Sequence, residues 1–465
     1  METTLQRRLG VTGIVFMVIA AAAPITVVGA NFPIIFTVSD SVGAPLMIAV
    51  ATVILLLFSV GFSWMSPRIP DAGAFYSYVH HGLGKRAGLG TAAVALLSYI
   101  LLTVSMTCYL GVQAGNLLES WTGIELPWWL ISAIMLLIVG YLGFHDIELS
   151  AKVLGLVLIL EVVAVVAIDL GVLLSGNELA TQPFSPSEAI SGAPGLGLLF
   201  AFLGFFGFEA TAVFRNEAKD PERTIPRATF LAVSIIGALY FVSSWLVISG
   251  LGVDDAVAIA QQNPDTAVIA LAGEVVAPIM ADVVQVLIVT SMFACMLAFH
   301  NIVTRYLFTL GQRGVLPRSL AVVHATHRAP SRASLWVSGT TTLIVAVSAL
   351  AQLDPVLQIY TWYSGAGAVG VIFMMTLTSA GILGFAKNYR AHATTTPRAN
   401  TGVLLATALG GIGLLLVLGI SLWNFPFLVD GTTAAVIWGL VLSGFFLAGF
   451  FLPSGALKSG AARTS

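Results

Sequence analysis

The sequence predicts an all-α polytopic membrane protein with twelve transmembrane helices. Three observations predict this class: 58% of the 465 residues are hydrophobic, only 9% are charged, and runs of roughly 20 apolar residues recur along the chain. A soluble domain carries about 25% charged residues, so this chain has too few charges for a water-facing surface. Disorder is excluded too, because disordered chains are poor in apolar residues. The net charge of −2 provides no basic surface for nucleic acid.

Twelve apolar segments are the predicted spans. Each has at least the roughly 17 residues that a transmembrane helix needs. The first follows Arg7 and Arg8 and contains an alanine run that resembles a signal-peptide cleavage site. Pro24 and more apolar residues follow that run, so we interpret the segment as a span. In order, the segments cover residues 13–37, 44–66, 89–118, 127–143, 151–174, 194–214, 228–251, 279–304, 334–350, 355–385, 402–423 and 432–452.

The distribution of lysine and arginine predicts the orientation of the chain in the membrane. With a cytoplasmic N-terminus, all 20 of these residues fall on the cytoplasmic side, whereas the opposite loops carry acidic side chains and no basic ones. A missed or spurious span would destroy this segregation. We therefore expect a multi-pass protein of the cytoplasmic (plasma) membrane with both termini in the cytoplasm. The basic residues lie in the tails 1–12 and 453–465 and in the loops 67–88, 144–152, 215–227, 305–332 and 386–398.

Two of the twelve segments contain helix-breaking residues, and they occupy corresponding places in the chain. In the first, Pro24 lacks a backbone donor and clashes with the preceding turn. In the sixth, Gly204 and Gly207 each cost about 1 kcal/mol of helix stability. Such breaks are tolerated at membrane depth only where protein or a water-filled cavity satisfies the backbone. The alternative explanation of these residues is a proline kink in the first segment and small-residue packing in the sixth. Their matched positions instead favour a transporter whose substrate site lies between the two breaks.

The matched breaks also predict the domain organisation. Residues 13–174 form the first repeat of five helices, and residues 194–385 form the second, inverted repeat. Residues 402–452 contain two peripheral helices, which could serve contact in a homodimer; a monomer is the alternative. The tails 1–12 and 453–465 are solvated.

Three cytoplasmic motifs resemble those of the amino acid–polyamine–organocation superfamily, which includes the bacterial amino acid permeases. Residues 70–78 resemble the family's P-x-A-G-x-x-Y stretch after span two, and residues 207–228 resemble the segment after span six. Residues 301–317 resemble the N-x-x-x-R and R-x-G-x-L-P patterns at the end of span eight. The resemblance implies a leucine-transporter-type fold. It also implies a transporter that imports a small amino acid, amine or polyamine by alternating access. No P-loop, metal-ligand cluster or nucleophile motif occurs in the sequence, so we expect neither an enzyme nor a cofactor.

One departure from the family pattern concerns the substrate. Many amino-acid-specific relatives have a G-x-G stretch in span one whose backbone amides hold the substrate carboxylate. The corresponding residues here are Ala23, Pro24, Ile25 and Thr26, and a proline has no amide proton to donate. Carboxylate binding must therefore be rearranged or absent, which favours amines and polyamines without excluding amino acids.

Two intramembrane acids are the candidates for proton coupling, because burying a charge in a bilayer costs several kcal/mol and needs a reason. Glu161 lies nine residues after Lys152, about 13 Å along a helix, and so close to the midplane. In proton-coupled relatives a lysine at the corresponding place is proposed to replace a sodium ion. Glu209 directly follows the second break. The alternatives are a packed structural acid for Glu161 and a helix cap for Glu209.

Other polar residues within the spans have structural explanations beside any functional one. Thr290 and Ser291 could supply oxygen ligands if sodium were the coupling ion, although ordinary helix hydroxyls are the simpler reading. His300 fits a satisfied structural histidine. Asp169, like Asp282, lies nearer the outer surface and is expected to be solvated or to line a vestibule.

Aromatic residues near the breaks are the remaining substrate-binding candidates, because they can close over a substrate or hold an ammonium group by cation–π attraction. In relatives one aromatic residue of span six is the outer gate. The aligned position here is Leu203, so Phe202 is the candidate gate. The substrate-binding candidates of this group are Phe202, Phe205, Phe206 and Phe208 in span six, Tyr99 in span three and Trp362 in span ten, together with Gly207 at the second break.

The alternative functions are an exchanger of the same fold and, in another class, a membrane sensor or channel.

Overall fold

The computed structural model describes residues 10–69, 74–143, 147–176, 178–208, 211, 218–324, 329–392 and 400–452. Within these residues, nine helices are long and apolar enough to cross a membrane. Three shorter apolar helices, Pro24–Ser39, Trp128–Leu142 and Pro194–Leu203, complete the apolar set. The predicted class, an all-helical membrane protein, is confirmed. The arrangement of twelve spans as two inverted repeats stays a prediction.

The predicted spans correspond to helices with the following bounds. Span one is divided into α1 (Val11–Ala22), α2 (Pro24–Thr26), the π-helical turn η1 (Val27–Asn31) and α3 (Phe32–Ser39). The other predicted spans contain α4 (Ala44–Met65), α6 (Lys85–Thr122), α7 (Trp128–Leu142), α8 (Ile147–Leu174), α10 (Pro194–Leu203), α12 (Pro221–Leu251), α15 (Pro278–Gln312), α16 (Ser331–Leu350), η6 (Pro355–Tyr360) with α17 (Thr361–His392), α18 (Thr401–Leu428) and α19 (Thr432–Phe450). Between the spans lie the short helices α5 (Ala74–Leu83), α9 (Pro186–Ala189), α13 (Ala256–Gln262) and α14 (Ala267–Val275) and the 3₁₀ turns η2 (Ser66–Arg68), η3 (Gln182–Phe184) and η5 (Arg318–Ala321).

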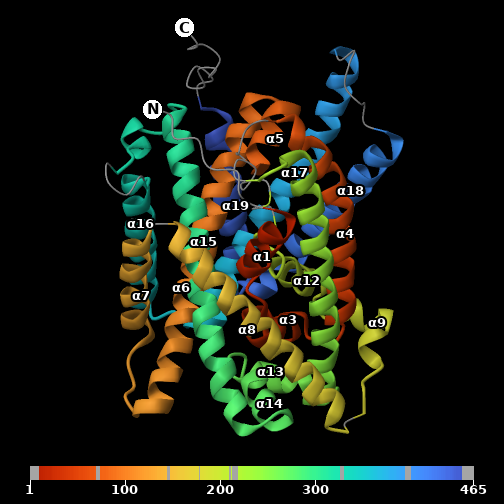
Figure 1. Ribbon diagram of the computed structural model, residues 1–465, viewed down its shortest axis with the longest axis vertical. Helices are drawn as coiled ribbons and strands as arrows, with labels where there is room; N and C mark the ends of the chain where they lie inside the picture. Colours follow the sequence, from red (N-terminus) through yellow and green to blue (C-terminus); the bar gives the residue numbers. More distant parts are fainter. Residues whose placement is uncertain are drawn as a thin grey trace.

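The interrupted first span occupies the centre of the bundle (Figure 1). Its first part, α1, packs against α8, α12 and α15, and α3 packs against α10. By contrast, only 6% of the apolar window of α19 is buried inside the protein. Residues 22–36, which contain the break, are buried within the bundle, where irregular backbone can be satisfied without lipid contact.

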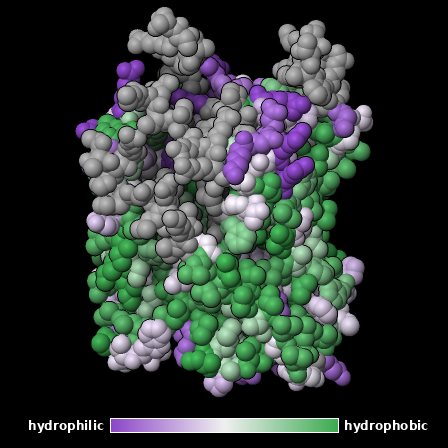
Figure 2. Space-filling model, in the orientation of Figure 1, coloured by the Kyte–Doolittle hydropathy of each residue, from purple (hydrophilic) through white to green (hydrophobic). Residues whose placement is uncertain are grey.

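Charges separate toward the two ends of the bundle. Helices α13 and α14 lie at one end and α5 at the other (Figure 1). Lys85 and Arg86 begin α6 at the α5 end, whereas Asp265, just before α14, accepts hydrogen bonds from Gln113 and Asn116 near the far end of α6. Figure 2 shows hydrophilic side chains gathered near the α5 end of this face, above a body covered by hydrophobic ones. We refer to the α13–α14 end as the outer end, following the orientation predicted from the sequence.

Candidate functional site

The break in span one occurs at a single residue. Helix α1 ends at Ala22, and Ala23 adopts a left-handed conformation with φ 50° and ψ 66°. Proline disfavours the helical conformation in the residue before it, which is why α1 ends just ahead of Pro24. A left-handed alanine costs about 1–2 kcal/mol, so its surroundings must hold it there. The carbonyl of Ala22, the last residue of α1, accepts a 3.1 Å hydrogen bond from the Tyr240 hydroxyl of α12.

Glu161 of α8 faces this break. Its side chain is 2% exposed, and its Oε2 accepts a 3.4 Å hydrogen bond from the Ile25 amide. The hydroxyl of Ser291 on α15 faces the same carboxyl group, and the Tyr240 and Cys295 side chains lie nearby. Glu161 thus joins α8 to the broken helix and lies beside α15.

The second break begins where α10 ends at Leu203. The chain continues in tight turns, in which the Phe205 amide donates to the Phe202 carbonyl and the Phe206 amide donates to the Leu203 carbonyl. Gly207 adopts φ 106°, a conformation that glycine takes at little cost and other residues avoid. The sequence-predicted Glu209 lies outside the described residues.

A central cavity of about 20 Å³ lies between the two breaks. This space is enough for about one water molecule. Two of its lining residues, Thr26 and Asn31, are only 3% and 2% exposed. Thr26 Oγ1 and Asn31 Oδ1 have no hydrogen-bond partner within the described part of the chain. The lining consists of Ala22, Ala23, Thr26, Val27, Asn31, Met106, Leu203, Gly204, Phe206, Cys295, Phe299 and Tyr360.

Buried polar atoms without partners are rare in proteins and call for an explanation. The other half of the Asn31 amide is satisfied, because Asn31 Nδ2 donates a 2.8 Å hydrogen bond to the Phe200 carbonyl of α10. That bond joins the two broken spans and aims an acceptor oxygen at the cavity. The central cavity thus offers acceptor atoms beside aromatic and aliphatic walls.

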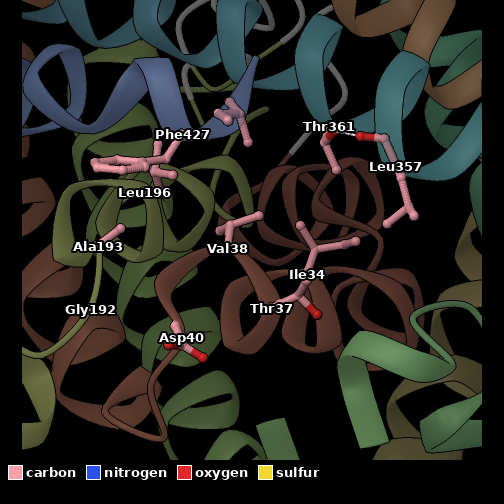
Figure 3. A pocket seen from close by; sticks show the side chains of 11 residues that line it. Ile34, Thr37, Val38, Asp40, Gly192, Ala193, Leu196, Leu357, Thr361 and Phe427 are labelled. Atoms are coloured by element: carbon pink, nitrogen blue, oxygen red, sulfur yellow. Dashed lines mark hydrogen bonds between the residues drawn. The ribbon is translucent and has the colours of Figure 1, made fainter. Parts of the chain in front are cut away.

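A larger cavity of about 460 Å³ lies toward the outer end, between α3, α10, η6, α17 and α18 (Figure 3). We call this space the vestibule. Asp40 is its one charged lining residue, and Asp40 Oδ1 accepts a 3.3 Å hydrogen bond from Gln261 of α13. The vestibule is lined by Ile34, Thr37, Val38, Asp40, Gly192, Ala193, Leu196, Leu357, Thr361, Phe427 and Leu428.

The Asn31–Phe200 hydrogen bond lies between the two cavities. Asn31 is one helical turn inward of the vestibule residue Ile34, and Phe200 is one turn inward of Leu196.

The sequence-predicted substrate residues fall into two groups. Ala23, Thr26 and Phe206 line the central cavity, and Pro24 and Ile25 lie at the break beside it. The others are not among its lining residues, and their substrate role stays a prediction. Phe205 contacts the Tyr240 ring, Phe208 contacts Phe58 and Phe62, Tyr99 contacts Phe299 and Tyr306, and Phe202 and Trp362 pack in the core around the site.

Nine of the twelve residues that line the central cavity lie outside the predicted substrate set, among them Asn31, Met106, Phe299 and Tyr360. Asn31 carried a readable signal, because it is a lone amide within an apolar span. The other three have no sequence signal that distinguishes them from core residues. Tyr360 is placed by the π-helical turn η6, and its ring stacks on Tyr109 with centroids 4.7 Å apart.

Three further polar residues can be compared with their expectations. Asp169 is 7% exposed and lines neither cavity, so the expectation that it is solvated or lines the vestibule is wrong. The reason is that α12 covers it and donates a hydrogen bond to it from Ser243. Asp282 is exposed, as expected. His300 is fully buried and lies 3.0 Å from the Ser334 hydroxyl, which fits a structural histidine.

Comparison with known proteins supports the interpretation of this chain as a transporter. A sequence profile for the family described as "Amino acid permease" matches residues 9–456. The low-affinity putrescine importer PlaP of Escherichia coli (strain K12) is 23% identical over 356 residues, which make up 73% of this chain and 75% of that one. The branched-chain amino acid permease BcaP of Bacillus subtilis (strain 168) is 22% identical over 412 residues, 82% of this chain and 81% of that one.

A solved structure shows the same fold. A mutant manganese transporter of Eremococcus coleocola superposes with a TM-score of 0.60 and 14% identity, covering 98% of this chain and 96% of the other. At that identity the likeness concerns the fold alone. The sequence profile, in contrast, spans nearly the whole chain. The chain therefore belongs to the amino acid permease family of the amino acid–polyamine–organocation superfamily, and it is a multi-pass membrane transporter of amino acids or amines.

Proposed function

We propose that this protein imports a small amino acid or amine across the bacterial plasma membrane by proton-coupled alternating access. The observation that carries the proposal is the position of Glu161. A buried carboxyl group meets the broken helix at Ile25, directly beside a small cavity lined by both interrupted spans. A proton that binds to this carboxyl group acts on the backbone that surrounds the substrate.

The coupling follows from the strength of the hydrogen bonds to Glu161. A carboxylate accepts stronger hydrogen bonds than a neutral carboxyl group. The charged form of Glu161 therefore holds the Ile25 amide firmly, which fixes the break against α8. Protonation weakens this bond and lets the broken helix move relative to α8. A proton taken from outside thus favours the inward-facing state once substrate is bound.

The polar atoms of the site favour a substrate with an ammonium group. Asn31 Oδ1 can only accept hydrogen bonds, and the Thr26 hydroxyl can accept as well as donate. Pro24 has no amide proton, and the Ile25 amide already donates to Glu161. The break therefore offers few donors for a substrate carboxylate, which favours an amine. The names of relatives allow both classes, because PlaP is a putrescine importer and BcaP a branched-chain amino acid permease.

Substrate reaches the site through the vestibule in this proposal. Among the described residues that line the vestibule, Asp40 carries the one carboxylate, and none is a lysine or arginine. This field attracts a cation and repels an anion. The lining is otherwise mostly aliphatic and aromatic, which suits the hydrocarbon part of an organic amine.

Proton coupling fits the site better than sodium coupling. The Ile25 N–H points at the carboxyl group, and an N–H donor beside a metal ion is unfavourable. The Thr290 hydroxyl donates to the carbonyls of Val286 and Leu287 within its own helix, which leaves it poorly placed as a ligand. An exchanger that trades one substrate for another remains the main alternative, and it differs from a symporter in having no net uptake.

The test is uptake into proteoliposomes that contain the full chain. Radiolabelled putrescine, leucine and other amino acids are supplied with an inward proton gradient, an inward sodium gradient, or neither. We expect accumulation to require the proton gradient in the wild type and to be lost in Glu161→Gln, which retains only exchange. Glu274→Gln, which changes an exposed acid at the end of α14, is the matched control and should behave like the wild type. Accumulation that follows sodium, or that survives Glu161→Gln, would contradict the proposal.

A further inference from the structure

Asp169 is a second buried acid on α8. It lies eight residues after Glu161 and five residues before the end of the helix at Leu174. Its side chain is 7% exposed, and its Oδ2 accepts a 2.7 Å hydrogen bond from Ser243 Oγ of α12. Its Oδ1 has no partner within the described residues. An acid this deeply covered in a membrane helix is costly, and it is a functional candidate by default.

The two acids lie on the same face of α8. Buried and exposed residues alternate along α8 with helical periodicity, and Glu161, Val165 and Asp169 follow one another at intervals of four on the buried face. Leu160 and Val163 are exposed on the opposite, lipid-facing side. Glu161 and Asp169 are therefore about 12 Å apart along the helix, two turns of a stripe that is shielded from lipid.

Helix α12 carries a hydroxyl group beside each acid. Tyr240 lies near Glu161, and Ser243, one turn further toward the outer end, bonds to Asp169. Still further outward, Ser249 is 4% exposed and its hydroxyl accepts a hydrogen bond from the Ala180 amide. Polar groups thus follow the contact between α8 and α12 from the outer end to the break. We call this contact the α8–α12 seam.

The seam is separate from both cavities. Asp169, Ser243 and Tyr240 line neither the vestibule nor the central cavity. A proton that used the seam would therefore not compete for space with the substrate.

Other titratable groups on the helices packed against α8 do not share this position. Glu274 of α14 and Asp282 of α15 are exposed, and His300 of α15 is buried beside Ser334 of α16. Cys295 of α15 lies near Glu161, at the inner end of the seam. The carboxyl group of Asp169 is therefore the acid that the seam places between the outer end and Glu161.

We propose that Asp169 is a second proton-binding site, which takes a proton from outside and passes it along the α8–α12 seam to Glu161. In this step an O–H bond breaks at the Asp169 carboxyl group and one forms at the Glu161 carboxylate, with the hydroxyls of Ser243 and Tyr240 and intervening water carrying the proton. Substrate uses the vestibule and the proton uses the seam. The inference rests on the proposed proton coupling through Glu161.

The test compares Asp169→Asn, Ser243→Ala and Ser244→Ala in proteoliposomes of the full chain. Ser244 is the matched control, because it is equally buried on α12 but its hydroxyl donates to the Phe241 carbonyl of its own helix. The probe is radiolabelled putrescine or leucine, whichever the wild type transports. Initial rates are measured for uptake driven by a proton gradient and for exchange without a gradient.

We expect Asp169→Asn to lower proton-driven uptake about tenfold and Ser243→Ala about threefold, with exchange within about twofold of the wild type in each. Ser244→Ala should leave both rates unchanged. A tenfold higher external proton concentration should partly restore uptake by Asp169→Asn, because Glu161 is then loaded directly.

Three outcomes would overturn the inference. Unchanged proton-driven uptake in Asp169→Asn would remove Asp169 from the path, and an equal loss of uptake and exchange would show a structural role. If Asp169→Asn does not fold, the test uses Ser243→Ala instead. An equal loss of proton-driven uptake and of exchange in Ser243→Ala would contradict the inference. Wild-type uptake that ignores the proton gradient would refute the proposed function itself, and that result is visible before any variant is made.

Discussion

The two interruptions differ in what holds them. The break at Ala23 is fixed by side chains from other helices, since Tyr240 donates to the Ala22 carbonyl and Glu161 accepts from the Ile25 amide. The break after Leu203 is held by short turns within its own chain and by packed phenylalanine rings. We therefore expect the first break to respond to a proton through the group that fixes it. We expect the second to adapt to the substrate.

The largest expected effect tests the first break through Glu161 itself. Glu161→Gln keeps an acceptor oxygen near the Ile25 amide but removes the charge and the titration. We expect at least a tenfold loss of proton-driven accumulation, with exchange retained. Measuring both rates in the same vesicles separates a coupling defect from a folding defect, because a misfolded protein loses both.

Asn31 tests how the two breaks communicate. Asn31→Ala removes the hydrogen bond to the Phe200 carbonyl and the acceptor oxygen that lines the central cavity. The Phe200 carbonyl keeps the Gly204 amide as a second donor, so the loss of the Asn31 bond costs about 1 kcal/mol, and we expect a KM for substrate that is about fivefold higher. Asn424→Ala is the control, because it removes a similar bond from α18 to the Gly195 amide of α10, away from the central cavity. An equal KM change in both variants would mean that α10 is merely loosened.

Tyr240 tests the first break with a smaller change. Tyr240→Phe removes the hydrogen bond to the Ala22 carbonyl, about 1 kcal/mol, and keeps the ring contacts with Phe32 and Phe205. We expect proton-driven uptake to fall about threefold to fivefold, with a smaller change in exchange. Tyr363→Phe, which removes the contact with Ser348 away from the break, should leave uptake as it is. Wild-type rates for Tyr240→Phe would mean that the break does not depend on α12.

The smallest effect is expected at the second break. A methyl group at Gly204 would lie 3.2 Å from Val27 Cγ1 and 3.3 Å from Tyr240 Cε2, both on side chains that can shift slightly. Gly204→Ala should therefore fold, as judged by size-exclusion chromatography, and transport small substrates within about threefold of the wild type. Because Gly204 lines the central cavity, larger substrates should lose more. A uniform loss for all substrates would contradict an adaptable second break.

Sequence reasoning reached the fold class, the family and the location of the first break, because each depends on a strong local signal. Apolar runs define membrane helices, and a proline within a span marks a break at the residue before it. Glu161 was also recognisable, since an acid in the middle of an apolar helix is rare. Each of these signals can be recognised within a single segment of the sequence, without knowing how the helices pack.

The remaining parts of the site depend on which helices pack together. The burial of Asp169 comes from Ser243 on α12, and no property of the α8 sequence distinguishes a covered acid from a solvated one near a helix end. Tyr360 and Phe299 reach the cavity only through the way in which α6, η6 and α15 meet. An aromatic residue in a membrane helix can face lipid, the protein core or the substrate, and its local sequence is the same in each case. Only the structure therefore shows which aromatic residues line the cavity.

Proton movement that accompanies transport tests the central claim most directly. Proteoliposomes loaded with a pH-sensitive dye are given external substrate without any imposed gradient, and internal acidification is recorded for the wild type and Glu161→Gln. We predict acidification in proportion to substrate uptake by the wild type, and none in Glu161→Gln despite measurable exchange. Substrate uptake without acidification in the wild type, or acidification that persists in Glu161→Gln, would contradict proton coupling through Glu161.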